Sequence, residues 1–193
     1  MPVIVIQRLD DAVPLARALV AGGLKNLEIT LRTPVALDAI RAIAAEVPEA
    51  RVGAGTVATP EHLDAVADAG GTFAVSPGLP GALRDAARSH DVPLVPGIMT
   101  PTEAMQAADA GFEILKFFPA EAAGGIALLK SIGGPLPHLK FCPTGGIGPS
   151  TFRDYLALPN VICVGGSWVA PKGLVADGDW DAVTALASET TTA

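Results

Sequence analysis

The sequence has few cysteines, few histidines and few charges, and each shortage excludes a class of protein. Its two cysteines, Cys142 and Cys163, fit neither a disulfide framework nor a zinc pattern, so we interpret both as small, reduced core residues. Charged residues make up only 17% of the 193 residues and hydrophobic residues make up half, which excludes intrinsic disorder. The three histidines are scattered, so we expect no metal site and no cofactor.

Long apolar runs and basic clusters are also missing. No run approaches the ~18 residues of a membrane span, and the N-terminus lacks the basic region and apolar stretch of a signal peptide. The net charge of −7, with no basic run, argues against nucleic acid or an anionic membrane as a partner. We therefore expect a cytoplasmic protein that holds any anionic small molecule by backbone amides or a few placed cations.

Short apolar segments recur along the chain at intervals of roughly 22 residues, each followed by a helical pattern. They start near residues 3, 24, 51, 72, 93, 112, 140 and 161. Each segment is almost continuously apolar rather than alternating, which is typical of parallel strands covered on both faces. Eight such units predict an α/β protein, a single compact (β/α)8 barrel over residues 1–193 with short loops. A doubly wound open sheet is the alternative.

The helix boundaries carry sequence signals of their own. Thr33, Thr59 and Thr100 each precede a proline, which predicts an N-cap hydroxyl followed by proline at the first helical position. Glu103 lies three residues after Thr100, so a capping box is expected there. Glycines stand where helices should end, at Gly22, Gly23, Gly70, Gly71 and Gly111.

Active sites of (β/α)8 barrels lie at the C-terminal ends of the strands, where two charged residues interrupt apolar sequence. Lys116 follows Ile114 and Leu115 near the end of one predicted strand; burial disfavours its charged form, and a neutral lysine can form a Schiff base with a ketone. Glu28 lies in the same way on another strand and can serve as general acid and base. Arg32, four residues later, can bind a carboxylate. The alternatives are a structural Lys116–Glu28 ion pair and a solvated Arg32.

Paired glycines follow the last two predicted strands, as Gly145-Gly146 after Thr144 and as Gly165-Gly166 before Ser167. Barrels often hold a phosphate at this place on backbone amides, to which a hydroxyl can add a donor. The alternative is that these glycines serve tight turns alone. A third glycine-rich segment, residues 53–58, fits a dinucleotide fingerprint formally, but no acidic residue ends the next strand, so nucleotide binding is not expected.

Seven segments together resemble the bacterial 2-keto-3-deoxy-6-phosphogluconate (KDPG) aldolases, also called 4-hydroxy-2-oxoglutarate aldolases. They occur in order over almost the whole chain, as LEITLRT (27–33), GAGT (53–56), SPG (76–78), PGIMT (96–100), LKFFPAE (115–121), CPTGGI (142–147) and VGGSW (164–168). The resemblance implies a class I aldolase of Entner–Doudoroff sugar-acid catabolism that acts on a phosphorylated keto acid, and a homotrimeric barrel. Because Met1 nearly abuts the first strand, we expect the family's usual N-terminal capping helix to be lacking.

The resemblance also implies a role for individual residues. It assigns the Schiff-base lysine to Lys116, the acid/base glutamate to Glu28 and the carboxylate-binding arginine to Arg32. It adds Thr56 and Thr144 as pocket threonines and Phe118 as a pocket wall. The phosphate site is assigned to the glycine pairs and a serine, that is, to Gly145, Gly146, Gly165, Gly166 and Ser167.

Three other functions stay open on the sequence alone. A sister aldolase for the phosphogalactonate epimer is similar, although that branch tends to have Asn-Ser-Pro where this chain has Arg32-Thr33-Pro34. A non-catalytic trimeric barrel used as an assembly scaffold would have no need of a buried lysine amine. A phosphosugar isomerase would share the phosphate loops but would not need Lys116.

Overall fold

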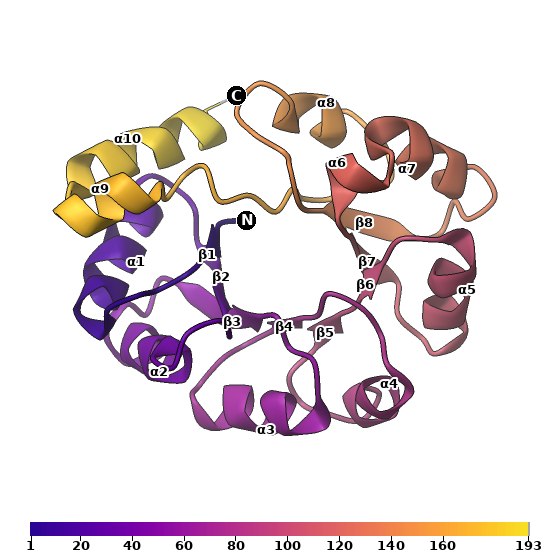
Figure 1. Ribbon diagram of the computed structural model, residues 1–193, viewed down its shortest axis with the longest axis horizontal. Helices are drawn as coiled ribbons and strands as arrows, with labels where there is room; N and C mark the ends of the chain where they lie inside the picture. Colours follow the sequence, from indigo (N-terminus) through magenta and orange to yellow (C-terminus); the bar gives the residue numbers. More distant parts are fainter. Residues whose placement is uncertain (193) are drawn as a thin grey trace.

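The computed structural model describes residues 1–192, in which parallel strands form a ring that is surrounded by helices (Figure 1). The strands are β1 (Val3–Ile4), β2 (Asn26–Thr30), β3 (Arg51–Gly55), β4 (Ala74–Val75), β5 (Leu94–Val95), β6 (Gly97–Ile98), β7 (Ile114–Phe117) and β8 (Lys140–Pro143). Each begins within three residues of a predicted start, except that the predicted fifth strand is divided into β5 and β6 around Pro96. Proline has no N–H to donate to a neighbouring strand, which explains the division.

Hydrogen bonds connect neighbouring strands around the ring. The first five strands pair in parallel in sequence order, and β6, β7 and β8 do the same. The eighth strand position is occupied by extended chain over residues 161–166, which forms isolated parallel bridges to β8 at Phe141–Val161 and to the first strand at Pro2–Gly166. The fold is therefore the predicted (β/α)8 barrel, not an open sheet.

The helices lie outside the strands, as Figure 1 shows. A 3-10 turn at Leu9–Asp11 precedes α1 (Ala12–Ala21), followed by α2 (Ala36–Glu46), α3 (Pro60–Asp68), α4 (Gly81–Ala87), α5 (Pro101–Asp109), α6 (Ala120–Ala123), α7 (Gly125–Gly133), α8 (Phe152–Leu156), α9 (Lys172–Asp177) and α10 (Trp180–Thr191). Within residues 1–192, no helix combines the length and the apolar character that crossing a membrane requires.

The three predicted threonine caps have three different outcomes. Thr100 is confirmed in full, because its hydroxyl accepts from the Glu103 N–H while the Glu103 carboxylate accepts from the Thr100 N–H. Thr59 occupies the N-cap of α3, but its side chain makes no capping hydrogen bond. The prediction for Thr33 is wrong: α2 begins at Ala36 with Val35 as its N-cap, and the Thr33 hydroxyl instead donates to the carbonyl oxygen of Ile6, 2.7 Å away.

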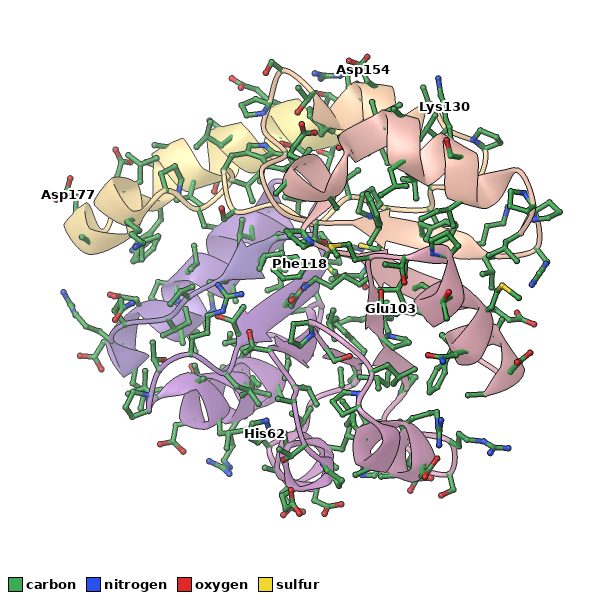
Figure 2. All side chains as sticks on the ribbon, turned by 45° about the vertical axis from the view of Figure 1, so that its right-hand side comes forward. His62, Glu103, Phe118, Lys130, Asp154 and Asp177 are labelled. Atoms are coloured by element: carbon green, nitrogen blue, oxygen red, sulfur yellow. The ribbon has the colours of Figure 1, made fainter. Side chains whose placement is uncertain are left out.

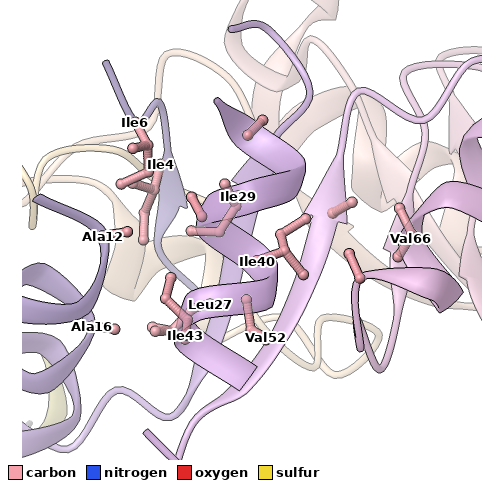
Figure 3. Packing of buried hydrophobic residues seen from close by; sticks show 14 of the residues in the cluster. Ile4, Ile6, Ala12, Ala16, Leu27, Ile29, Ile40, Ile43, Val52 and Val66 are labelled. Atoms are coloured by element: carbon pink, nitrogen blue, oxygen red, sulfur yellow. The ribbon is translucent and has the colours of Figure 1, made fainter. Parts of the chain in front are cut away.

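The core of the N-terminal half lies between the strands and the helices that cover them (Figure 3). Leu27 and Ile29 of β2 are fully buried, as are Ile40 and Ile43 of α2, which lie three residues apart and so on one side of that helix. The predicted glycine helix ends are confirmed where the backbone turns back with positive φ, at 90° for Gly23, 79° for Gly70 and 94° for Gly111.

Candidate active site

Lys116 and Glu28 meet inside the barrel from strands on opposite sides of the ring. Lys116 is the third residue of β7 and Glu28 the third residue of β2, and the Lys116 Nζ lies 3.4 Å from the Glu28 Oε1. Both are buried, with relative exposures of 3% and 0%. The pairing foreseen from the sequence is therefore present in the structure, although the two residues are 88 positions apart in the chain.

The Glu28 carboxylate is an unusual group to bury this deeply. Burial raises the pKa of Glu28, and the opposing attraction of Lys116 and Arg32 only partly offsets this shift. Within residues 1–192, its Oε2 atom accepts no hydrogen bond, although water cannot reach it. The space for the carboxylate comes from Gly55 on the adjacent strand, because a Cβ at Gly55 would overlap Oε1. A carboxylate with one paired and one unpaired oxygen has the capacity to take up or deliver a proton.

Lys116 has an aromatic neighbour as well as an acidic one. Its Nζ lies 5.0 Å from the centroid of the Phe118 ring, within the range of a cation–π contact. Phe118 lies in the middle of the molecule in Figure 2, whereas His62 of α3 and Asp177 of α9 lie at its periphery. The reactive end of Lys116 is thus held between a carboxylate and an aromatic wall.

Arg32 is held by Thr56 at the rim of the barrel. The Arg32 Nε donates to the Thr56 Oγ1 over 3.0 Å. Thr56 has a φ of 61°, and it is the one non-glycine residue with positive φ in the described chain. A β-branched residue rarely adopts this conformation, and such strain is concentrated at functional sites. The two residues stay close together at the ends of β2 and β3, where a substrate carboxylate would meet both.

Of the two glycine pairs, Gly145-Gly146 has the backbone conformation and the free amides that suit an anion site, whereas the Gly165 and Gly166 N–H groups donate to the carbonyl oxygens of Pro143 and Met1. Gly145 and Gly146 have φ values of 105° and 80°, which side chains rarely allow. A Cβ at Gly165 would overlap the Thr144 hydroxyl, and one at Gly166 would overlap the Trp168 ring. No acceptor within residues 1–192 takes the amide protons of Gly145 or Gly146. These donors remain available to a bound anion.

A cavity of about 770 Å³ joins these groups at the mouth of the barrel. Eight of the eleven predicted residues line it, namely Arg32, Phe118, Thr144, Gly145, Gly146, Gly165, Gly166 and Ser167. Two of the other three are in contact with lining residues, Lys116 with Phe118 and Thr56 with Arg32, and Glu28 is in contact with Lys116. The structure therefore brings all of the predicted residues to one place.

Sequence reasoning missed one wall of this cavity. Gln7 and Arg8 line it from the segment after β1, Asp11 from the 3-10 turn that follows, and Lys172 from α9. Arg8 forms an ion pair with Asp11 at 3.5 Å. The sequence did contain a signal for this wall, namely polar residues directly after the first apolar segment. The C-terminal ends of all eight strands meet at the same face of a barrel, so residues at that position are expected near the site.

Comparison with known proteins identifies the family. The family model "KDPG and KHG aldolase" matches residues 1–186. The chain belongs to this family. It is an aldolase, a carbon–carbon lyase, and not an inert scaffold or an isomerase. The KHG/KDPG aldolase of Escherichia coli is 56% identical over 98% of this chain and 89% of its own length.

Two solved aldolase structures share the fold closely. A KDPG aldolase from Legionella pneumophila, with pyruvate captured as a covalent carbinolamine intermediate, has a TM-score of 0.95 and 48% identity over 97% of this chain and 91% of its own. The KDPG aldolase of Zymomonas mobilis with 3-phosphoglycerate has a TM-score of 0.94 and 49% identity over 99% of this chain and 90% of its own.

Proposed function

We propose that this aldolase cleaves KDPG to pyruvate and glyceraldehyde 3-phosphate through a Schiff base on Lys116. The observation that carries the proposal is the buried contact of 3.4 Å between Lys116 and Glu28, next to Phe118, which lines the cavity. A lysine enclosed by protein, with a carboxylate to move its protons, is the arrangement that iminium chemistry requires. The carbinolamine in the Legionella pneumophila relative supports the same type of intermediate.

The chemical steps follow from the two side chains. The Lys116 nitrogen attacks the C2 ketone to give a carbinolamine, and Glu28 delivers the proton with which the C2 hydroxyl leaves as water. The resulting iminium withdraws electrons from C3. Glu28 then takes the proton of the C4 hydroxyl, the C3–C4 bond breaks, and its electron pair becomes the enamine. After glyceraldehyde 3-phosphate leaves, C3 is protonated and water hydrolyses the iminium to pyruvate and free Lys116.

The rest of the cavity supports binding of both ends of the substrate. Arg32 and Thr56 lie at the rim, where the pyruvoyl carboxylate can be held by the guanidinium and the hydroxyl. On the other side, the amides of Gly145 and Gly146, together with the exposed Ser167, suit a terminal phosphate. The two charged ends of a six-carbon keto acid would then place its C2 carbon between them, at Lys116.

A second substrate, 4-hydroxy-2-oxoglutarate, is proposed for the same site, with pyruvate and glyoxylate as products. Support comes from the name KHG/KDPG aldolase that the E. coli relative carries. This substrate shares the pyruvoyl half of KDPG and lacks a phosphate, so the groups around Lys116 would act on it unchanged. The glycine loops would contribute less to its binding, and we expect a lower kcat/KM for it than for KDPG.

Two variants test the assignment in an assay of pyruvate release from KDPG. Lys116→Met is expected to abolish turnover, while Lys130→Met, on the exposed face of α7, keeps the wild-type rate. Glu28→Gln is expected to lower kcat by about 10²–10⁴-fold, the usual contribution of a positioned general acid–base. Appreciable cleavage by Lys116→Met would refute the mechanism, and a near-normal rate in Glu28→Gln would remove Glu28 from its role.

We also propose that the aldolase is a homotrimer, as its resemblance to the family implies. The exposed large apolar side chains Met99, Met105 and Ile114 support association of the chain with itself. Sedimentation analysis is expected to give three times the chain mass of 19.5 kDa. A species with the mass of one chain would overturn the proposal.

A further inference from the structure

Tyr155 and Glu121 form a hydrogen bond that the proposed chemistry does not use. The Tyr155 hydroxyl donates to the Glu121 Oε1 over 2.5 Å. Tyr155 belongs to α8 and is fully buried, whereas Glu121 belongs to α6 and is exposed overall. The two helices lie next to each other in Figure 1. Burial and the Glu121 charge raise the pKa of Tyr155, so its proton stays on the oxygen and the tyrosine acts as a permanent donor.

Glu121 is also in direct contact with the loop that carries the free amides. Its N–H donates to the carbonyl oxygen of Gly145 over 3.1 Å, and the preceding Ala120 N–H donates to that of Thr144 over 2.8 Å. The side chain of Glu121 covers Gly146 so closely that a Cβ there would lie 2.7 Å from the Glu121 Cβ. The backbone of the loop is therefore set by Glu121 at two successive residues.

The far end of the same loop is fixed to α8, which carries Tyr155. The Phe152 N–H donates to the carbonyl oxygen of Gly148 over 3.0 Å, and the Gly148 N–H donates to the Thr151 hydroxyl over 3.2 Å. The hydrogen bond between Tyr155 and Glu121 thus closes a ring that runs from the glycine loop through α8 and α6 back to the loop. Residues 145–148 are held from both sides of this ring.

The hydrogen bond also determines where the negative charge of Glu121 points. With Tyr155 as its partner, the carboxylate is directed toward α8, and within residues 1–192 it accepts no hydrogen bond from the loop amides. A carboxylate that lost this donor would still be next to Gly145 and Gly146, whose N–H groups have no acceptor within residues 1–192. Carboxylates accept hydrogen bonds strongly, so a released Glu121 would compete with a substrate phosphate for these amides.

We propose that Glu121, fixed by Tyr155, is a positioning residue that keeps the Gly145–Gly146 amides open for the phosphate and so sets the preference of the aldolase for phosphorylated substrates. The inference rests on the proposed function, since it assumes that the phosphate of KDPG binds this loop. It assigns no part in bond breaking to either residue. Affinity for the phosphate end is therefore affected, and the Schiff-base half of the site is not.

The test compares KDPG, which carries a phosphate, with pyruvate, which does not. Tyr155→Phe frees the Glu121 carboxylate to compete for the amides, whereas Glu121→Ala opens the ring of contacts that holds residues 145–148. For each variant we expect the KM for KDPG to rise about tenfold with kcat within about twofold of wild type, because ground-state and transition-state binding fall together. Trapping of pyruvate on Lys116 by borohydride is expected to show the wild-type dependence on pyruvate concentration. Glu121→Gln keeps an oxygen that can accept from Tyr155, and it is expected to retain a KM near the wild-type value.

Asp154→Asn serves as the matched control, because it removes a carboxylate from the outer, exposed side of α8 (Figure 2). Its KM for KDPG is expected to be unchanged. A wild-type KM in both Tyr155→Phe and Glu121→Ala would overturn the inference, as would an equal loss of pyruvate trapping in these variants. Should Tyr155→Phe fail to fold, the exposed Glu121→Ala and Glu121→Gln pair decides alone. A wild-type protein that neither cleaves KDPG nor traps pyruvate would instead overturn the proposed function.

Discussion

Gly55→Ala should disable the site through one added methyl group, because it removes the space that the Glu28 carboxylate occupies. The new Cβ would lie 2.8 Å from both Cγ and Cδ of Glu28, against 3.4–4 Å for an ordinary contact. The Glu28 side chain must therefore move by more than half an ångström, which takes its Oε1 atom away from the position beside Lys116. Misplacement of a catalytic group by about 1 Å can cost on the order of 10²-fold in rate, so we expect kcat to fall by about 10–10²-fold.

The same substitution has a predicted cost in stability that identifies its cause. Overpacking of a buried site typically costs about 1–3 kcal/mol, and we expect that loss in the free energy of unfolding of Gly55→Ala. In a Glu28→Ala background the crowding is gone, so adding Gly55→Ala should cost nothing further. Both quantities are measured directly, kcat by coupling pyruvate release to lactate dehydrogenase and stability by urea titration.

Gly81→Ala is the control, because nothing lies within 4 Å of a Cβ at that position. It should leave kcat unchanged and should not lower stability. A Gly55→Ala enzyme with kcat within twofold of wild type would refute the reasoning, since it would show that the position of the Glu28 carboxylate does not limit the reaction. An equal stability cost with and without the Glu28 side chain would refute the steric explanation.

Three further predictions concern strain, capping and charge. Thr56→Gly should be about 1 kcal/mol more stable than Thr56→Ala in urea titration, because both lose the hydroxyl and only glycine relieves the positive φ; equal stability would deny the strain. Thr100→Ala should cost about 1 kcal/mol of stability without affecting kcat, and Thr59→Ala clearly less, since its hydroxyl caps nothing. The folded state binds the Glu28 proton more tightly than the unfolded chain does, because the pKa of Glu28 is raised by burial. The free energy of unfolding of wild type, relative to that of Glu28→Gln, should therefore decline as the pH rises from 4.5 through the raised pKa. A difference in unfolding free energy that does not change with pH would contradict the shift.

The barrel and the grouping of most candidate-site residues could be predicted because both depend on patterns that are local in the sequence. Apolar segments at a regular interval fix the strands, and the strand ends fix which residues share a face. Lys116 and Glu28 stand out because a charged side chain inside an apolar segment needs a partner. In the structure each is the partner of the other, with 3.4 Å between Nζ and Oε1. Thr56 and Phe118 have no such signal and were reached through the family resemblance alone.

The features that could not be predicted depend on how distant segments pack together, which the sequence does not show directly. Thr33 has the residue type of an N-cap, but its hydroxyl donates to the carbonyl oxygen of Ile6, just after β1, and not to α2. The cavity wall at Gln7 and Arg8 follows a strand that ends without a glycine or a buried charge to mark it. The hydrogen bond between Glu121 and Tyr155 joins residues 34 positions apart on two short helices, and no periodicity connects them.

Borohydride reduction in the presence and absence of pyruvate, followed by peptide mapping, tests the central claim most directly. The account predicts one pyruvate-dependent adduct per chain, located on Lys116, with none on the other lysines, Lys25, Lys130, Lys140 and Lys172. The adduct should be lost in Lys116→Met. An adduct on another lysine, or no adduct from the folded wild-type protein at neutral pH, would contradict the assignment of Lys116 as the Schiff-base residue.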